Sequence, residues 1–314
     1  MLDSFGREIS YLRVSITDRC NFRCLYCMPE EGVPKKEHSD ILSFEDMEKI
    51  ISVLVELGIT KIRVTGGEPL VRRGCTSFLK DLGNLKIDQL GLTTNGFYID
   101  QYKEELKEAK LDLLNISLDS LDAEKFQTIT RGGDINKVLS GIDTAREIGV
   151  KEIKINAVLM KGLNDMDIRR FAEFGKEKGV KVRFIELMPF SVCNSYENYG
   201  ISADEVIKAN GLIRTKQKDY SNNAETYMFE DGLEIDFIRP ITNKFCAMCN
   251  RVRLTADGKL LLCLHGNAIV DLKDKIDNRE ELKKAIIDGI KNKPKEHGIE
   301  QGVIQCRVMN SIGG

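Results

Sequence analysis

Six of the nine cysteines fall into two tight groups, and these groups are the strongest candidates for chemistry in the sequence. Cys20, Cys24 and Cys27 have the spacing C-x3-C-x2-C, and such soft thiolate ligands select zinc, Cu(I) or an iron–sulfur cluster. A structural zinc site needs four ligands, but no fourth Cys or His lies within ten residues of this group. Three thiolates on a four-iron cluster leave one iron open for a substrate or cofactor. We therefore expect a 4Fe-4S cluster on the first group.

The second group has the spacing C-x2-C-x13-C and consists of Cys246, Cys249 and Cys263. His265 follows closely, so this spacing fits a Cys3His zinc site as well as it fits an iron–sulfur cluster. Arg251 and Arg253 flank Val252 just after Cys249 and place two guanidiniums on one face of a strand. Forked cationic donors suit a triphosphate, although a solvated edge strand would show the same alternation.

The elements that must position these groups alternate between strands and helices. Runs rich in β-branched residues predict strands at Tyr11–Thr17, Lys61–Thr65, Gln89–Thr94, Leu113–Asp119, Glu152–Leu159 and Lys181–Leu187. Helical stretches separate them: Ser43 is a candidate N-cap for one, and Gly58, Gly149 and Gly179 each end another. Six successive βα units predict a parallel sheet that curls into an incomplete α/β barrel.

The rhythm of strands and helices changes beyond about residue 200. There we expect a hairpin at Thr226–Phe237, then the second cysteine group, and then a helix near Asn278–Lys291. The sequence thus predicts a barrel over residues 1–200 and a C-terminal extension over residues 201–314.

The predicted strands alternate polar and apolar residues, which is unusual for a parallel sheet that helices cover. Arg13, Arg63, Asn115 and Lys154 each lie between two apolar neighbours. One face of the sheet would therefore meet the helices, while the other would be polar and cationic. A barrel with such a lumen holds a ligand. A half-solvated antiparallel sheet is the alternative that would alternate in the same way.

The composition is that of a globular protein, which we expect in the cytoplasm. Lys and Arg number 47 against 49 Asp and Glu, and a net charge of −2 favours neither nucleic acid nor an anionic membrane as a partner. The apolar runs are too short to span a bilayer, and the N-terminus has no signal pattern. We expect Cys75, Cys193 and Cys306 to be buried packing residues.

The segment Thr65-Gly66-Gly67-Glu68-Pro69 follows the second predicted strand. Glycines at a strand end allow close backbone approach to a ligand, and Glu68 can pair with an ammonium group. Together with the C-x3-C-x2-C loop after the first strand, this motif resembles the radical S-adenosylmethionine (SAM) enzymes. The resemblance implies that the open iron of the first cluster binds SAM. Reductive cleavage of SAM would then yield a 5′-deoxyadenosyl radical that takes hydrogen from the substrate.

Further motifs resemble one family of these enzymes, the GTP 3′,8-cyclases of molybdenum-cofactor biosynthesis. They are Arg13-Val14-Ser15-Ile16-Thr17-Asp18-Arg19, Gly91-Leu92-Thr93-Thr94-Asn95-Gly96, Asn115-Ile116-Ser117-Leu118-Asp119 and Arg183-Phe184-Ile185-Glu186-Leu187-Met188. The resemblance covers essentially the whole chain and implies a second 4Fe-4S cluster on the second cysteine group. It also implies that carbon 3′ of the GTP ribose attacks carbon 8 of guanine. The product would be (8S)-3′,8-cyclo-7,8-dihydroguanosine 5′-triphosphate, in the first step of molybdopterin biosynthesis.

The same resemblance implies three sets of site residues. The SAM site would be lined by Tyr26, Gly67, Ser117 and Met188. The GTP site would be lined by Arg13, Arg63, Thr93, Lys154, Arg251, Val252 and Arg253. The closing residues Gly313 and Gly314 would reach into the catalytic pocket and serve the radical step.

Two other functions stay open from the sequence. One is another radical SAM enzyme with an auxiliary cluster, such as a peptide maturase, and the other is a non-enzymatic iron–sulfur electron carrier or sensor. The family further implies an electron donor and a downstream cyclic pyranopterin monophosphate synthase as partners. The sequence decides neither the reductant nor whether the chain forms a homodimer.

Overall fold

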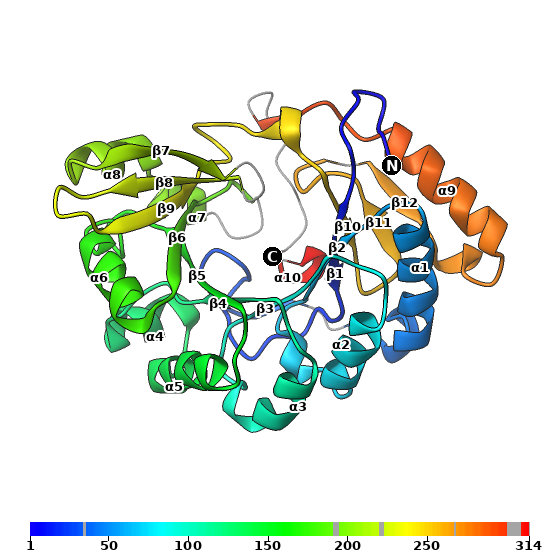
Figure 1. Cartoon of the computed structure of the whole chain (residues 1–314), viewed down its shortest axis with the longest axis horizontal. Helices are drawn as coiled ribbons and strands as arrows, with labels where there is room; N and C mark the ends of the chain where they lie inside the picture. The colour runs from blue at the N-terminus through cyan, green and yellow to red at the C-terminus, as the bar shows by residue number, and fades with distance from the viewer. Residues whose placement is uncertain (34–35, 191–194, 220–222, 267, 300–308, 314) are drawn as a thin grey trace.

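The computed structural model describes residues 1–33, 36–190, 195–219, 223–266, 268–299 and 309–313, and it shows one curved sheet with helices outside it (Figure 1). Within these residues the sheet has 12 strands in the order β12-β11-β10-β1-β2-β3-β4-β5-β6-β9-β8-β7. Its central strands are parallel: β1 (Tyr11–Ser15), β2 (Lys61–Thr65), β3 (Gln89–Thr94), β4 (Leu113–Ser117), β5 (Glu152–Leu159) and β6 (Lys181–Glu186). The six predicted strands are confirmed, and β1, β4 and β6 end slightly earlier than expected.

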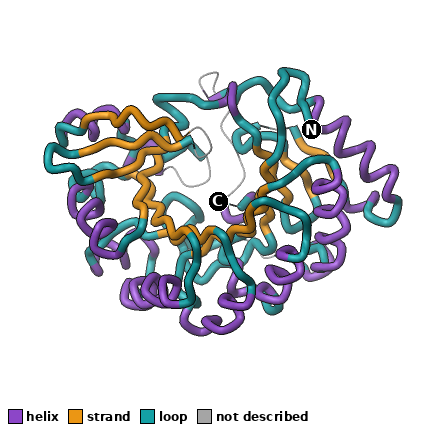
Figure 2. The backbone as a smooth tube through the Cα atoms, viewed as in Figure 1, coloured by secondary structure: helices purple, strands orange, loops and turns teal. Residues whose placement is uncertain are grey.

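Helices lie between the central strands in the chain and cover the outer side of the sheet, as Figure 2 shows. They are α1 (Phe44–Glu56), α2 (Cys75–Gly83), α3 (Lys103–Glu108), α4 (Ala123–Thr130), α5 (Ile135–Glu147) and α6 (Ile168–Lys178). The prediction that Ser43 is the N-cap of α1 is confirmed, because its Oγ accepts a hydrogen bond from the Asp46 N–H at 3.0 Å. Gly179 ends α6 with a φ of 64°, a left-handed conformation that glycine adopts without strain. The incomplete barrel is confirmed.

The alternation along the strands separates an apolar outer face from a polar lumen. On β1, Leu12 and Val14 are fully buried in the core that also contains Ile50 and Leu54 of α1. Burial of one such side chain stabilises the folded state by about 1.5–3 kcal/mol. Arg13, between Leu12 and Val14, therefore faces the lumen. The predicted polar lumen is confirmed, and the antiparallel alternative is wrong because the central strands are parallel.

The segments beyond residue 200 join the same sheet at both of its edges. β7 (Ile213–Asp219), β8 (Ala224–Met228) and β9 (Glu234–Ile238) form an antiparallel meander, and β9 pairs in parallel with β6. β10 (Arg251–Leu254) pairs in parallel with β1, and β11 (Lys259–Leu261) and β12 (Ile269–Asp271) extend that edge in antiparallel order. The predicted hairpin is β8 and β9. The division of the chain at residue 200 stays a prediction.

The remaining helices are α7 (Ser195–Tyr199), α8 (Ala203–Ala209), α9 (Arg279–Lys291) and α10 (Met309–Ile312). α9 confirms the helix predicted near residue 278 and packs beside α1, where Arg279 and Lys283 pair with Glu56 at 2.8 and 2.5 Å. α10 lies near the middle of the barrel, next to the C-terminus (Figure 1). In the described parts of the chain, no helix combines the length and apolar character needed to cross a membrane.

Candidate active site

The first cysteine group lies in the loop after β1, at the carboxyl end of the central strands. The end of α4 holds this loop, because Arg131 Nη1 donates to Arg23 O at 3.2 Å and to Met28 O at 3.0 Å. The three thiols of the loop are half-buried and belong to Cys20, Cys24 and Cys27. Incomplete burial of this kind suits ligands that a bound group must reach.

The donor set of this loop fits an iron–sulfur cluster. Burial raises the pKa of Cys20 to about 11. Burial also raises the pKa of Cys24 well above its usual range, and the two neighbouring thiols raise it further, so the three sulfurs influence one another. The Phe22 N–H and Asn95 Nδ2 point at Cys20 Sγ from 3.4 and 3.9 Å, as donors to cluster-bound sulfurs do. A bound metal centre would favour the thiolate forms that burial alone opposes.

The glycines of the Gly66–Gly67 turn serve a contact between two loops. Gly67 N–H donates to Thr17 O at 2.7 Å, and a Cβ on Gly66 would lie 2.7 Å from the same oxygen. A Cβ on Gly67 would collide with Arg19 O. Close approach was expected toward a ligand, but the structure shows it toward the backbone that leads into the first cysteine group. These glycines therefore set the position of that loop against β2.

Glu68, which was expected to pair with an ammonium group, contacts donors of the protein itself. It is fully buried, and its carboxylate accepts hydrogen bonds from Thr94 Oγ1 at 2.8 Å, Asn95 N–H at 2.6 Å and Leu70 N–H at 3.0 Å. Burial raises the pKa of Glu68 to about 7, although these donors oppose the shift. The carboxylate fastens the end of β2 to the end of β3, a contact that the sequence does not reveal.

Three of the residues expected around SAM end a strand or follow one at its carboxyl end, and their shared role stays a prediction. Gly67 follows β2, Ser117 ends β4 and Met188 follows β6. Tyr26 lies in the cysteine loop, and its hydroxyl donates to Asp119 Oδ2 at 2.8 Å. Asp119, which sequence reasoning did not select, also accepts from Val158 N–H at 2.8 Å, and burial raises its pKa to about 6. Its place just after the polar strand β4 was the available signal.

The second cysteine group lies at the opposite end of β1 from the first. β10 runs parallel to β1, with Tyr11 beside Arg251, so Cys249 precedes β10 at the amino end of β1. β11 is antiparallel to β10, which returns Cys263 to that same end. β1, whose five residues span about 16 Å, therefore lies between the two groups.

His265 does not complete a zinc site in this structure. Its Nε2 lies 3.1 Å from Met188 Sδ, and its ring centroid lies 5.0 Å from that of Phe190. Among the described residues, no three Cys, His, Asp or Glu side chains converge as ligands of a single metal ion. Zinc would draw its sulfurs to within about 4 Å of one another. Burial raises the pKa of Cys246, and the thiols of Cys263 and Cys249 raise it further, so the three sulfurs lie near one another.

A row of arginines on three adjacent strands lines one wall of the lumen. Arg13 of β1 lies in register with Arg63 of β2 on one side and with Arg253 of β10 on the other. Burial lowers the pKa of Arg13, and Arg253 and Arg63 lower it further because like charges repel. Burial also lowers the pKa of Arg253 to about 10. A bound polyanion would relieve this repulsion.

Lys154 and Thr93 lie on the far wall of the same lumen. β4 places Asn115 in register with both of them, and Asn115 Nδ2 donates to Thr93 Oγ1 at 3.3 Å. Lys154 is 1% exposed, and its ammonium lies 2.7 Å from Glu152 Oε2. Arg183, which was not selected from the sequence, is buried beside them and donates to Asn115 Oδ1 at 3.0 Å. The wall thus combines cations with hydrogen-bonding amides.

Tyr11 is a further residue that sequence reasoning did not select. The guanidinium carbons of Arg63 and Arg251 lie 5.6 and 5.5 Å from its ring centroid. Burial raises the pKa of Tyr11, but the surrounding arginines outweigh that effect and lower it. The ring holds two guanidiniums in place by cation–π contacts.

Val252 was expected to line the GTP site together with the two arginines that flank it. Its side chain is instead buried in the core, on the opposite face of β10 from those arginines.

The C-terminal tail enters the lumen. Asn310 Nδ2 donates to Asp18 O at 2.7 Å, and Arg253 Nη1 donates to Ile312 O at 3.2 Å and to Gly313 O. Gly313 has a φ of 74°, and a Cβ on it would lie 2.7 Å from Thr65 Cγ2. Arg253, expected at the triphosphate, therefore contacts the tail in this structure. Gly314 lies outside the described residues.

Cys75 is buried in α2 as expected, whereas Cys193 and Cys306 lie outside the described residues.

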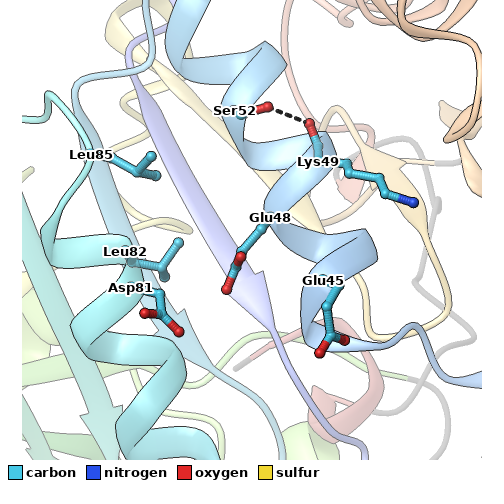
Figure 3. Close-up of a pocket in the computed structure, with 7 residues that line it drawn as sticks. All are labelled: Glu45, Glu48, Lys49, Ser52, Asp81, Leu82 and Leu85. Carbon is cyan, nitrogen blue, oxygen red and sulfur yellow. Dashed lines mark hydrogen bonds between the residues drawn. The ribbon is translucent and has the colours of Figure 1, made fainter.

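A pocket of about 330 Å³ lies on the outer side between α1 and α2 (Figure 3). It is lined by Glu45, Glu48, Lys49, Ser52, Asp81, Leu82 and Leu85. Carboxylates dominate its charge, so the pocket does not suit an anionic nucleotide.

Comparison with protein families finds two matches along the chain. Residues 14–175 match the Radical SAM superfamily, and residues 180–299 match Molybdenum Cofactor Synthesis C. A GTP 3′,8-cyclase of Peptoclostridium acidaminophilum is 47% identical over 320 residues, covering 100% of this chain and 98% of the relative. A GTP 3′,8-cyclase of Alkaliphilus oremlandii is 41% identical over 320 residues, with 100% of both chains covered.

Solved structures with the same fold are more distant in sequence. Streptococcus suis SuiB bound to S-adenosylmethionine has a TM-score of 0.64 at 16% identity, covering 87% of this chain and 65% of that one. Native anSMEcpe with bound AdoMet has a TM-score of 0.60 at 18% identity, covering 96% of this chain and 88% of that one. At these identities the likeness concerns the fold alone.

Proposed function

This chain belongs to the GTP 3′,8-cyclase family of radical SAM enzymes, and we propose that its barrel holds GTP between two iron–sulfur clusters. It converts GTP to (8S)-3′,8-cyclo-7,8-dihydroguanosine 5′-triphosphate, the first step of molybdopterin biosynthesis. One observation carries the proposal: Arg253, Arg13 and Arg63 form a row along one wall of the lumen, with a cysteine group beyond either end of β1. A polyanionic substrate as long as a nucleoside triphosphate suits that arrangement.

The first cysteine group would hold the cluster that binds SAM. Bound there, the cluster supplies the electron for reductive cleavage of SAM, which provides the hydrogen-abstracting group. Tyr26, Gly67, Ser117 and Met188 would line this site at the carboxyl ends of the strands. Asp119 would keep the Tyr26 ring in one orientation through the 2.8 Å hydrogen bond.

The arginine row and its neighbours would bind and orient GTP. Arg13, Arg63, Arg251 and Arg253 would contact the triphosphate with paired N–H donors, and Lys154 and Thr93 would contact the nucleoside from the far wall. Fixed donors on rigid strands hold carbon 3′ of the ribose toward the SAM end of the barrel. That orientation would raise the rate of cyclisation, because the reacting atoms are already positioned when the substrate binds.

The second cysteine group would hold a cluster whose open iron accepts a ligand from the guanine end of the substrate. The base would then be fixed at one end of the lumen and the ribose nearer the other. The tail covers the lumen through Ile312, which packs with Phe190 and Leu261. Gly313 and Gly314 would therefore exclude water from the reacting centre and serve the radical step.

The partners of this reaction are also part of the proposal. The enzyme requires an electron donor, and its product is a substrate for a cyclic pyranopterin monophosphate synthase. A homodimer is compatible with this scheme. Reduced clusters and the unpaired thiols of Cys20, Cys24, Cys246, Cys249 and Cys263 suit the reducing conditions of the cytoplasm.

Anaerobic reconstitution tests the proposal. Wild-type protein is expected to bind about eight irons, and a Cys246/Cys249/Cys263 triple alanine variant about four. With SAM, dithionite and GTP, mass spectrometry should detect the cyclised triphosphate and 5′-deoxyadenosine in equal amounts. SAM cleavage without any product from GTP would identify a different radical SAM enzyme. Reversible redox chemistry without SAM cleavage would identify an electron carrier.

A further inference from the structure

Lys293 is a buried lysine in the loop after α9, close to the second cysteine group. Its residue is 3% exposed, and its Nζ donates to Arg251 O at 2.9 Å and to Leu262 O. These carbonyls belong to the chain segments that carry Cys249 and Cys263. A single ammonium therefore ties two cysteine segments together.

The charges around Lys293 are those of the cysteine site. Burial lowers the pKa of Lys293, and the thiols of Cys249 and Cys263 are the first groups that oppose this effect. The carboxylate of Asp3 also lies near, but it is already paired with Arg7 at 2.6 Å. A buried ammonium without a counter-charge is costly. Thiolates bound to a metal cluster supply the missing negative charge.

Arg7 ties the third cysteine to the same loop. Its Nη1 donates to Cys246 O at 2.9 Å and to Lys295 O at 2.8 Å, and its Nη2 donates to Pro294 O at 2.7 Å. Arg7 is 8% exposed, and Asp3 fixes its orientation. The turn at the N-terminus and the loop after α9 are therefore both fastened to the Cys246 turn.

We propose that Lys293 and Arg7 form a cationic clamp, which holds the three cysteines of the second group and raises the reduction potential of the cluster bound there. The inference rests on the proposed function, because that function requires a second cluster. Positive charge beside a cluster favours its reduced form, which carries one more negative charge. The clamp also sets the segments that must converge on the irons, since its hydrogen bonds reach all three.

The test uses protein that carries only the second cluster, in a Cys20/Cys24/Cys27 triple alanine background. Lys293→Gln keeps an N–H donor for the two carbonyls but removes the charge, and Lys293→Arg keeps the charge. Lys295→Met is the matched control, because Lys295 is an exposed lysine in the same loop. The measurements are iron and sulfide per chain after anaerobic reconstitution, and the midpoint potential from an EPR-monitored titration.

Lys293→Gln is expected to lower the ratio of reduced to oxidised cluster about tenfold at a fixed potential. This corresponds to a shift of about 59 mV for one electron. Lys293→Arg should recover most of the shift, and Lys295→Met should show none. Equal potentials in the Lys293→Gln and Lys295→Met variants would overturn the clamp. A background variant that binds no iron would instead overturn the second cluster and the proposed function with it. Circular dichroism verifies folding, and Arg7→Lys, which loses the forked donors, repeats the comparison.

Discussion

Replacement of Arg63 by methionine should have opposite effects on the free protein and on its complex with GTP. Arg63 is buried on β2, one strand away from Arg13, and a Cβ on Gly91 would lie 3.2 Å from its Nε. Methionine retains much of the side-chain volume and removes the charge. The variant therefore separates the electrostatic role of Arg63 from its packing.

The effect on the free protein follows from Coulomb repulsion. Arg251 and Arg13 carry like charges near Arg63, and two unit charges about 5.5 Å apart at an effective dielectric constant of about 20 repel by about 3 kcal/mol. The cation–π contact of Arg63 with the Tyr11 ring offsets about 0.5–2 kcal/mol of this repulsion. We expect Arg63→Met to leave the free energy of unfolding unchanged or to raise it by about 1–2 kcal/mol, which is a few degrees in Tm.

The effect on GTP binding has the opposite sign. Truncation of one partner of a buried, charged hydrogen bond costs about 2–4 kcal/mol, which is about 30- to 1,000-fold in Kd. Isothermal titration calorimetry of the reconstituted protein measures that loss, and thermal unfolding without GTP measures the stability. Lys107→Met on the exposed face of α3 is the control and should change neither quantity.

One combination of results would refute this reasoning. If Arg63→Met lowered the free energy of unfolding by more than about 2 kcal/mol and left the GTP affinity unchanged, Arg63 would be a structural residue. The arginine row would then not be a polyanion site, and the orientation proposed for the substrate would be wrong.

Substitutions at three other positions test separate parts of the structure. Gly67→Ala should displace the first cysteine loop, because the new Cβ would collide with Arg19 O. Iron analysis should then show the loss of about half of the bound iron. Tyr11→Leu should weaken GTP binding by about 1 kcal/mol, because the aromatic ring holds the arginines in place. Tyr11→Phe keeps the ring and should bind GTP as the wild type does. If calorimetry showed a similar loss of affinity in both variants, the hydroxyl would have the role instead of the ring. Burial alone would raise the pKa of Asp257, but Lys36, at 2.7 Å, and other donors lower it well below its usual range. Asp257→Asn should therefore cost about 1–2 kcal/mol at pH 7, a penalty that fades as the pH falls below about 4; a pH-independent penalty in urea unfolding would contradict the ion pair.

Features that depend on residues close together in the chain could be predicted before the structure was known. The six central strands, the N-cap Ser43 and the left-handed Gly179 follow from local propensity and steric preference. The polar lumen follows from the period of two along each strand. The cysteine spacings indicate soft metal ligands because that chemistry belongs to the residue type.

Which of these segments lie side by side became known from the three-dimensional fold. β10 joins β1 in parallel, and this pairing alone places the two cysteine groups at opposite ends of the lumen with the arginine row between them. The hydrogen-bond partners of Glu68 and the close neighbours of Gly67 come from other loops, so these contacts could not be read from the motif that contains both residues. Tyr11 resembled an ordinary strand residue until Arg251 came into register beside it. Strand pairing and loop contacts are long-range packing outcomes, and no local pattern encodes them.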